Sequence, residues 1–429
     1  MSEPGEAARS AAELDALATR AAEAVDAERL VAWTRALVRI RSVVDPEAGT
    51  FERPAAEWVA ATLREAGFDP VVTEVAPDRP NVICDWSGSG FDPERHRTLM
   101  FEGHSDVVTE GDRAAWSVDP FGGEVDDEGR LFGRGSADMK GGVAAAMAAL
   151  CAVREVAPDL PGRIRLGIVV DEEGMMLGIK RFVEDGWADA VDGAIVCEPE
   201  QNELCLFQKG AMRLHVRAVG VMAHGAMPYA GVNPVRGLAR FLMRTWELEQ
   251  QEQQRLGEHP HLGLPWITPT VVRAPEGGEA QLNVMPGTAF QAIDVRTVPG
   301  QDHDALLAEI TAAARATEAE FPGLALEIQR VESRPWTETP ADDPLVRALE
   351  AAYPQVLGTP PRYGGVPGAT DGTFLRAWAN VPIVTVGPGD REIPHQVDEF
   401  VRISDLIASA RLYAAAAIRY LGATNPVPT

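Results

Sequence analysis

The sequence predicts an α/β protein in which a sheet covered by helices is interrupted by a smaller α+β insertion. The chain has 429 residues, more than one hydrophobic core usually holds, so two domains are expected. Short apolar runs typical of buried strands alternate with helical patterns toward both ends of the chain. Between them the elements follow the order β-α-β-β-α-β of a ferredoxin-like unit. We therefore expect one domain built from residues 1–210 and 333–429, with residues 211–332 inserted as the other.

The elements of the larger domain follow from the spacing of apolar residues. Apolar side chains recur at helical intervals over residues 11–40, which predicts an amphipathic helical segment that is interrupted near residue 27. Further apolar runs predict strands over residues 80–86, 98–108, 164–170 and 193–197, and a helix over residues 141–156. After the insertion, we expect helices over residues 343–353 and 405–421 and a strand over residues 381–387.

The insertion has its own alternating pattern. It is expected to contain a strand over residues 211–220, a helix over 233–254, strands over 268–274 and 287–296, a helix over 302–321 and a last strand over 325–332. An insertion of this length is within the usual size range of domains.

The composition restricts the partners and the compartment of the protein. A net charge of −25 argues against nucleic acid and anionic membranes as partners. No apolar run approaches the length of a membrane span, and the acidic N-terminus does not resemble a signal peptide. The four cysteines form no CxxC pair and are expected to be small buried residues. We therefore expect a cytoplasmic protein.

Polar residues that could bind a metal ion stand at the ends of the predicted strands. Histidines and acids occur there in FEGHSDVV, GRGSADMKGG, VVDEEG and VCEPE, and a further histidine occurs in the loop REIPHQVDEF. In an open α/β sheet, this edge is where ligands bind. The candidate residues are His104, Asp106, Asp138, Glu172, Glu173, Glu198 and His395.

Each of these residues taken singly has a simpler explanation. A lone histidine is usually a hydrogen-bonded core or surface residue, and an acid at the end of a strand often caps a helix. Proline and glycine near His395 could mark only a turn. The combination favours a metal site, because histidines and carboxylates together form the mixed N/O ligand set that zinc accepts.

Six consecutive motifs resemble those of one enzyme family. GHSDVV, GRGSADMKGG, DEEG, CEP, AHGAMP and PHQVDEF are similar to the motifs of the two-zinc aminoacylase and carboxypeptidase family, and they occur in the family's order. That family includes acetylornithine deacetylase, succinyl-diaminopimelate desuccinylase, carboxypeptidase G-type enzymes and several dipeptidases. The resemblance extends from about residue 30 to the C-terminus. It implies a zinc-peptidase-like catalytic domain with a mixed sheet, and it makes the insertion a lid and dimerisation domain.

The resemblance assigns a role to each candidate of the catalytic domain. Asp138 would bridge two Zn²⁺ ions, for which Co²⁺ can substitute. His104 and Glu198 would complete one ion's ligands, and Glu173 and His395 the other's. Asp106 would orient the ring of His104, and Glu172 would be the general base that takes a proton from water.

The two adjacent glutamates carry different roles, which their backbone could explain. Neighbouring residues in an extended backbone point in opposite directions. Glu173 could then hold a metal ion while Glu172 faces the water. Asp171 receives no chemical role, and we expect it to make local hydrogen bonds near the turn.

The resemblance also assigns residues of the insertion and of a glycine-rich loop. His224 would reach the active site of the neighbouring subunit in a homodimer and stabilise the oxyanion. Arg296 would clamp a substrate carboxylate, and Asn283 would be a further substrate-binding residue. The loop GGVPGATDG, with Gly368 and Thr370, would lie against the substrate. A phosphate cradle is the alternative for this loop, but no Gly-Lys-Ser/Thr ending supports it.

These assignments predict a zinc-dependent amidohydrolase that removes the acyl group from a small N-acylated amino acid. A dipeptidase or a glutamate-releasing carboxypeptidase is the alternative on the same site. An inactive metal-binding homologue is disfavoured because Glu172 and all the ligands are present. Phosphoesterase chemistry is disfavoured because it would need cationic groups beyond Arg296.

Overall fold

The chain folds as two compact units, which we describe separately. The computed structural model describes residues 9–423, so residues 1–8 of the acidic N-terminal segment lie outside it. The first unit contains the described residues up to Leu206, then Thr339–Gly364 and the residues from Thr370 onward. The second unit contains Phe207–Glu338 and Gly365–Ala369.

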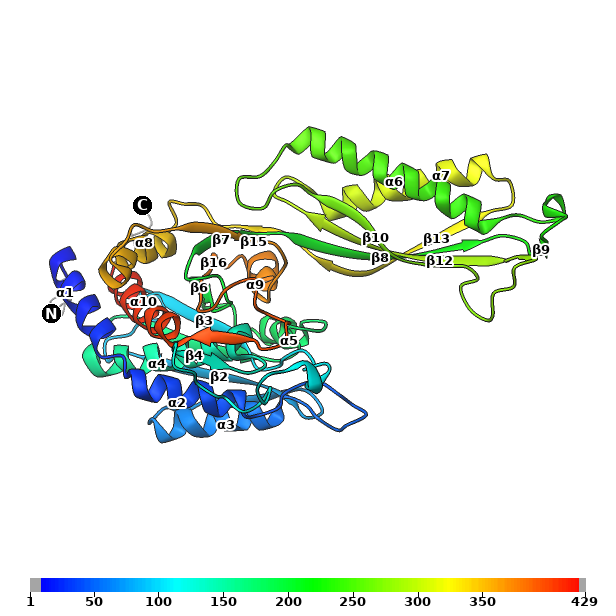
Figure 1. Cartoon of the computed structure of the whole chain (residues 1–429). Coiled ribbons are helices and arrows are strands. Elements are labelled where there is room, and N and C mark those ends of the chain that lie inside the picture. Colours follow the sequence, from blue (N-terminus) through cyan, green and yellow to red (C-terminus); the bar gives the residue numbers. More distant parts are fainter. Residues whose placement is uncertain (1–8, 424–429) are drawn as a thin grey trace. The chain divides into compact units, whose positions relative to one another are not determined.

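A mixed sheet forms the centre of the first unit (Figure 1). Its strand order is β1-β2-β5-β3-β6-β16-β7, and β15 also pairs with β7. The strands β5, β3, β6 and β16 are parallel to one another, whereas β1, β2 and β7 are antiparallel to their neighbours. The strands are β1 (Val71–Ala76), β2 (Arg79–Ser87), β3 (Thr98–His104), β5 (Arg163–Val169), β6 (Gly193–Val196), β7 (Leu204–Gln208), β15 (Tyr363–Val366) and β16 (Ile383–Thr385). A separate pair is formed by β4 (Arg130–Phe132) and β17 (Phe400–Arg402).

Helices flank this sheet, as the sequence predicts. The helices α1, α2, α4, α8 and α10 pack on one another, and α4 and α10 contact β3. The helices α5 and α9 pack together, where Phe182 and Phe374 join a core with Met100 and Val196 of the sheet. The helices are α1 (Ala11–Glu23), α2 (Ala27–Val38), α3 (Arg53–Glu65), α4 (Gly141–Val156), α5 (Leu177–Glu184), α8 (Pro344–Leu357), α9 (Gly372–Ala379) and α10 (Ile403–Gly422).

Local sequence signals explain where these helices begin. Ser10 and Glu13 form a capping box at the start of α1, and Asp26 caps α2, so the interruption expected near residue 27 is confirmed. Asp343 caps α8, whose first residue is Pro344. The strand expected over residues 98–108 is shorter, because β3 ends at His104 and Asp106 follows it.

The helix α4 is the most apolar helix of the first unit and helps to position the site. The expectation that no apolar run approaches the length of a membrane span is wrong for one stretch, because Ser136–Val156 is long and apolar enough by length and composition. Its most apolar window is 94% buried, so packing in the core accounts for its composition. A Cβ atom at Gly142 would lie 2.0 Å from the carbonyl oxygen of Cys197. Glycine at this position therefore allows the start of α4 to approach the end of β6, which precedes Glu198.

The second unit is a four-stranded antiparallel sheet with two helices on one face (Figure 1). The strand order β10-β12-β8-β13 and the intervening helices give the split β-α-β topology. Along β8, buried Leu214 and Val216 alternate with exposed Arg213 and Arg217, so one face meets α6 and α7 and the other is solvated. The elements are β8 (Gly210–Val219), α6 (Pro234–Leu256), β10 (Trp266–Arg273), β12 (Thr288–Thr297), α7 (His303–Glu320) and β13 (Ala325–Arg334).

Short strands extend the second unit at two places. The strand β9 (Ala223–His224) pairs with β11 (Val284–Met285). The strand β14 (Thr337–Glu338) pairs with Phe207 and Gln208 at the end of β7.

Candidate metal centre

The five predicted ligands occupy the ends of strands and the loops that follow them. His104 is the last residue of β3, and Asp138 lies in the short helical segment Ser136–Lys140 before α4. Glu173 follows β5, Glu198 follows β6, and His395 lies in the loop before β17. Because β3, β5 and β6 are parallel, their carboxyl ends meet at one edge of the sheet.

The structure brings these five side chains together around Asp138. His104 Nε2 lies 3.1 Å from Asp138 Oδ1 and 3.6 Å from Glu198 Oε1. His395 Nε2 lies 3.4 Å from Asp138 Oδ2 and 3.1 Å from Glu173 Oε1. Each oxygen of Asp138 thus faces a different histidine, and each histidine has a further glutamate beside it. This arrangement can provide two neighbouring cation sites that share one carboxylate.

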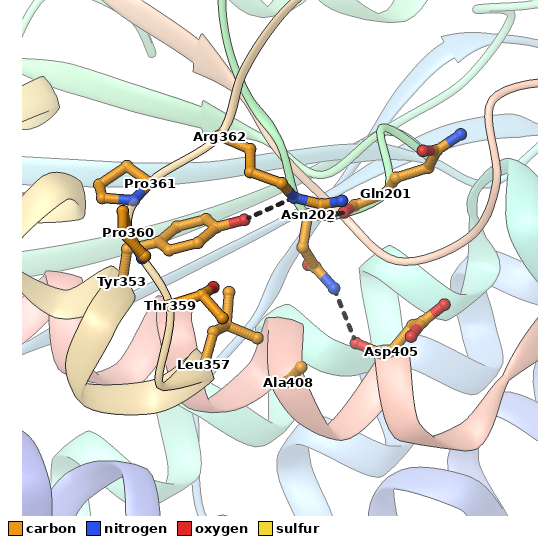
Figure 2. Close-up of a pocket in the computed structure, with 10 residues that line it drawn as sticks. All are labelled: Gln201, Asn202, Tyr353, Leu357, Thr359, Pro360, Pro361, Arg362, Asp405 and Ala408. Atoms are coloured by element: carbon orange, nitrogen blue, oxygen red, sulfur yellow. Dashed lines mark hydrogen bonds between the residues drawn. The ribbon is translucent and has the colours of Figure 1, made fainter.

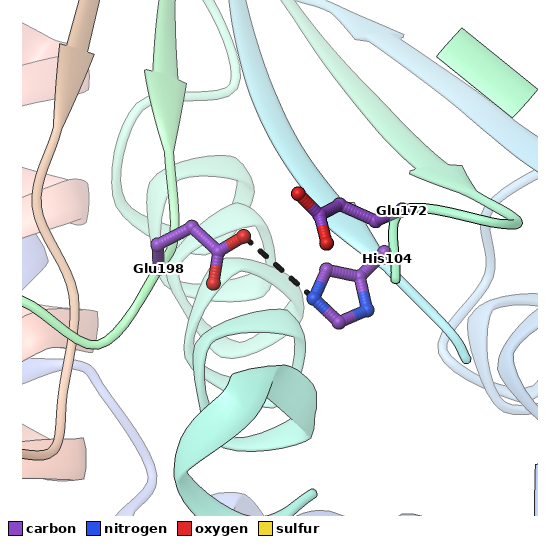
Figure 3. A group of neighbouring side chains, drawn as sticks. All are labelled: His104, Glu172 and Glu198. Carbon is purple, nitrogen blue, oxygen red and sulfur yellow. Dashed lines mark ion pairs between the residues drawn. The ribbon is translucent and has the colours of Figure 1, made fainter. Parts of the chain in front are cut away.

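Glu172 lies beside these five side chains, and we call the six residues together the cluster. Ligand atoms of His104, Glu172 and Glu198 all lie within 4.8 Å of one another, and the same holds for His104, Asp138 and Glu173. Figure 3 shows the carboxylates of Glu172 and Glu198 next to the His104 ring, reached from the ends of different strands. The cluster of histidine and acidic side chains is therefore suited to binding a metal ion.

The extended backbone that we expected for the two glutamates is wrong. Glu172 and Glu173 lie in a turn after β5, and Asp171 before them has a positive φ of 68°. The turn, rather than strand alternation, separates their side chains. Asp171 makes the local hydrogen bonds that we expected, because it accepts from the N–H groups of Met175 and Leu177, and it also pairs with Arg79.

Asp106 connects His104 to this turn. The carboxylate of Asp106 accepts hydrogen bonds from the backbone N–H of Glu172 at 3.2 Å and of Glu173 at 3.1 Å. His104 Nδ1 lies 3.0 Å from the carbonyl oxygen of Asp106 and 3.6 Å from its carboxylate. Asp106 is 1% exposed, so it can hold the ring and both glutamates in fixed positions.

Burial and crowding dominate the electrostatics of the cluster. Burial raises the pKa of Glu172 well above its usual value, and the nearby carboxylates of Asp371 and Glu173 add to this effect. Burial likewise raises the pKa of Glu198, and Asp138 raises it further. Burial and crowding oppose the ionisation of these carboxyl groups. A bound cation would offset their negative charges, so the site favours cations.

The pKa values of the two histidines are also raised, which for an imidazole favours the charged form. Burial lowers the pKa of His104, but the hydrogen bond with Asp138 and the charge of Glu198 outweigh burial and raise it well above its usual value. Hydrogen bonds with Asp138 and Glu173 raise the pKa of His395 to about 10. Both rings thus lie where the surrounding carboxylates favour positive charge. That charge can come from a proton on the imidazole or from a bound metal ion.

Buried charged residues that were not predicted from the sequence support the Asp138 loop. Glu399 Oε1 accepts hydrogen bonds from the backbone N–H of Ala137 at 3.0 Å and of Asp138 at 3.1 Å, and Glu399 Oε2 accepts from Arg134. Lys140 is 1% exposed and donates to the carbonyl oxygen of Ile40 at 2.7 Å. All three charged residues stand inside the motifs GRGSADMKGG and PHQVDEF, which was the available signal.

The remaining predicted residues divide between the units. His224 on β9 lies opposite Val284 on β11, and the carbonyl oxygen of Asn283 accepts from the N–H of Gly225 at 2.7 Å, so the two predicted residues are neighbours in the second unit. Arg296 on β12 forms an ion pair with Asp294 at 2.6 Å.

The glycine-rich loop crosses from the second unit into the first. Gly368 belongs to the second unit, and a Cβ atom there would meet nothing within 4 Å. Thr370 belongs to the first unit and is buried just before α9, and its hydroxyl oxygen accepts from the N–H of Gly372 at 3.2 Å. Its neighbour Asp371 is near enough to influence Glu172.

Comparison with known proteins agrees with this geometry. Residues 100–419 match the model of peptidase family M20/M25/M40. The chain belongs to this family. A succinyl-diaminopimelate desuccinylase from Methylocella silvestris is 31% identical over 403 residues, which cover 90% of this chain and 97% of that protein. The chain is therefore an M20-type hydrolase.

Solved structures of other proteins share the fold. The di-peptidase Dug1p from Saccharomyces cerevisiae matches with a TM-score of 0.71 and 15% identity, over 95% of this chain and 98% of that chain. A dinuclear metal-binding peptidase of the M20 family from Bacillus subtilis matches with a TM-score of 0.68 and 16% identity, over 92% of this chain and 98% of that chain. The mixed sheet flanked by helices is thus the fold that the sequence predicts.

Proposed function

We propose that the protein is a zinc-dependent amidohydrolase that cleaves the amide bond of a small N-acylated amino acid. The observation that carries the proposal is the partly buried cluster in which Asp138 lies between two histidines, each with its own glutamate, while Glu172 stands beside them. The similarity to a desuccinylase over nearly the whole chain supports deacylation rather than another hydrolysis. A small substrate with a carboxylate is the expected partner.

The donor set supports two zinc ions. His104 and Glu198 would hold one ion, Glu173 and His395 would hold the other, and Asp138 would be shared by both. Mixed imidazole and carboxylate ligands suit Zn²⁺, and Co²⁺ accepts similar ligands. When bound, the ions would polarise the amide carbonyl and make water a better nucleophile.

Glu172 would move the proton during the reaction. Its carboxylate would accept a proton from the attacking water and deliver it to the amine nitrogen as the C–N bond breaks. Burial raises the pKa of Glu172, so its carboxylate takes up a proton more readily. The protonated carboxyl group can then act as the acid that releases this proton. Asp106 would keep Glu172 in place through the backbone N–H of the turn.

The second unit would supply a lid and the dimer interface. His224 would stabilise the oxyanion in the active site of the neighbouring subunit, and Arg296 with Asn283 would bind the substrate carboxylate. Gly368 and Thr370 would contact the substrate from the glycine-rich loop. Support for a homodimer through the lid comes from β10, an edge strand with exposed Trp266. An exposed edge strand can pair with a copy of itself.

We also propose a cytoplasmic location. Cys84, Cys151, Cys197 and Cys205 are buried free thiols, which fits a reducing compartment. Nucleic acid remains an unsuitable partner because of the net charge of −25.

A dipeptidase is the second candidate on the same site. The observation that favours it is the fold shared with the yeast di-peptidase over nearly the whole length of both chains. A glutamate-releasing carboxypeptidase would use the same groups, whereas an inactive homologue would be expected to lack Glu172 or a ligand.

A hydrolysis panel distinguishes these activities. N-acetyl, N-succinyl and N-formyl amino acids are compared with dipeptides in the presence of added zinc or cobalt. We expect an N-acyl amino acid to give the highest kcat/KM. Higher kcat/KM for dipeptides than for every acylated amino acid would favour the second candidate, and no metal-dependent hydrolysis of any substrate would contradict the proposal.

A further inference from the structure

A pocket that includes none of the cluster residues lies in the first unit. Its volume is about 510 Å³, which is within the range of small-molecule sites. Its walls come from three parts of the chain: the loop after Glu198, the end of α8 with the following loop, and the start of α10 (Figure 2). The lining residues are Gln201, Asn202, Tyr353, Leu357, Thr359, Pro360, Pro361, Arg362, Asp405 and Ala408.

One part of this pocket is apolar. Leu357, Pro360, Pro361 and Ala408 present hydrocarbon surface, and the ring of the buried Tyr353 lies beside them (Figure 2). Apolar surface held in a concave pocket favours a ligand that carries a hydrocarbon group.

The other part carries two opposite charges, Arg362 and Asp405, that influence each other electrostatically. Arg362 donates from Nη2 to the carbonyl oxygen of Gln201 at 2.8 Å and from Nε to the Tyr353 hydroxyl at 3.4 Å, which leaves Nη1 without a protein partner among residues 9–423. The carboxylate of Asp405 accepts from the Ser404 hydroxyl at 3.3 Å. Within the described part of the chain, no ion pair joins Arg362 to Asp405. Both groups can therefore receive a ligand.

The charges around the pocket are balanced. A polar cavity of about 240 Å³ shares Gln201, Arg362 and Asp405 with the pocket and adds Asp390 and Arg402 to the lining. Two arginines and two aspartates disfavour both a simple anion and a simple cation. Asp405 lies in the first turn of α10, and burial raises the pKa of its carboxyl group, so a cationic ligand group would stabilise the ionised form.

We propose that this pocket binds a free α-amino acid with an apolar side chain. The carboxylate would accept hydrogen bonds from the guanidinium of Arg362, and the ammonium group would pair with Asp405. The side chain would occupy the apolar part between α8 and α10. A zwitterion matches the balanced charges, and the hydrocarbon part matches the remaining surface.

The pocket is connected to the metal centre through one short loop. Glu198 and the pocket residues Gln201 and Asn202 belong to the same segment, and the N–H groups of Glu200 and Asn202 both donate to the carbonyl oxygen of Gly387. The side chain of Asn202 bonds to the carbonyl oxygen of Asp405 and to the Ser409 hydroxyl. A ligand that contacts Asn202 and Asp405 would thus be linked to Glu198 and modulate turnover.

This regulatory consequence rests on the proposed function, because a deacylase would release amino acids of the class that binds here. The binding claim itself does not depend on the reaction and is tested without turnover. Isothermal titration calorimetry of the metal-loaded full chain with L-leucine measures it directly. We expect 4-methylpentanoate, which lacks the ammonium group, and 3-methylbutylamine, which lacks the carboxylate, each to bind about tenfold more weakly or worse.

Variants separate this pocket from the metal centre. Arg362→Gln removes the carboxylate partner, and Ala408→Phe fills the apolar part, so each should weaken leucine binding about 10- to 100-fold. Arg411→Gln changes an exposed arginine of α10 that does not line the pocket, and Glu172→Gln changes the metal centre; both should bind leucine like the unmodified protein.

Three results would overturn the proposal. The first is no heat of binding for L-leucine with the unmodified protein. The second is 4-methylpentanoate binding as tightly as leucine, which would make the pocket an anion site. The third is unchanged leucine binding in both Arg362→Gln and Ala408→Phe, which would put the ligand elsewhere.

Discussion

Asp106→Asn is expected to loosen the turn that carries Glu172 and Glu173. The Asp106 carboxylate accepts two backbone N–H groups at 3.2 and 3.1 Å and is 1% exposed. Asparagine has one acceptor oxygen, so one N–H group loses its partner and faces an amide NH₂ donor instead. A lost hydrogen bond to a charged group, with a buried donor left unsatisfied, amounts to about 2–3 kcal/mol.

Two measurements test this reasoning. Urea unfolding should show a loss of stability of about 2–3 kcal/mol, and metal affinity should fall about 10- to 100-fold because His104 and Glu173 are less well fixed. Asp189→Asn is the matched control, because Asp189 is exposed and the substitution makes the same chemical change elsewhere in the first unit. Asp106→Asn with the stability and metal affinity of the control would refute the role of Asp106.

Three further predictions concern the second unit and the thiols. His224→Ala should lower kcat about 100-fold or more without changing metal content, and mixed dimers with Glu172→Gln should regain activity if the histidine acts across subunits; no regain would contradict this. Arg296→Ala should raise KM about tenfold or more for substrates with a free carboxylate, whereas an equal rise for amide-capped substrates would exclude the clamp. Burial raises the pKa of the Cys84 thiol to about 12, so a disulfide reagent at pH 8 should label it only after unfolding. Rapid labelling of the folded protein at pH 8 would contradict this expectation. The unfolded thiol ionises near pH 9, so the contribution of Cys84 to the free energy of unfolding is present below pH 9 and is lost as pH rises toward 12.

Most long regular elements were predictable from the sequence because their signals are local, although the helix α3 (Arg53–Glu65) was not predicted. The helix expected over residues 141–156 is α4 with the same bounds, and capping residues Ser10 and Asp26 mark the starts of α1 and α2. The short helices α5 and α9 were not predicted. Each is held largely by contacts with the other and with the sheet, which a local pattern does not contain.

The convergence of the candidate residues was predictable, because their residue types and their positions at strand ends can be read from the sequence. His104, Asp138, Glu173, Glu198 and His395 converge as expected because parallel strands end at one edge. The contacts of the supporting residues were not predictable even though Arg134, Lys140 and Glu399 stand inside the motifs, because these contacts are tertiary hydrogen bonds between distant segments. Glu399 holds the Asp138 loop from beyond residue 390, and the bonds from Asp106 to the glutamate turn have no signature in the spacing of either motif.

The most direct test of the account is the metal content of a matched pair of variants, Glu172→Gln and Glu173→Gln, measured beside their activity. The two residues are neighbours, and the substitution is identical. We expect Glu172→Gln to keep the metal content of the unmodified enzyme while turnover falls about 10²- to 10⁴-fold, and Glu173→Gln to lose bound metal. Loss of metal from Glu172→Gln, or turnover within a few-fold of normal in that variant, would contradict the separation of base and ligand.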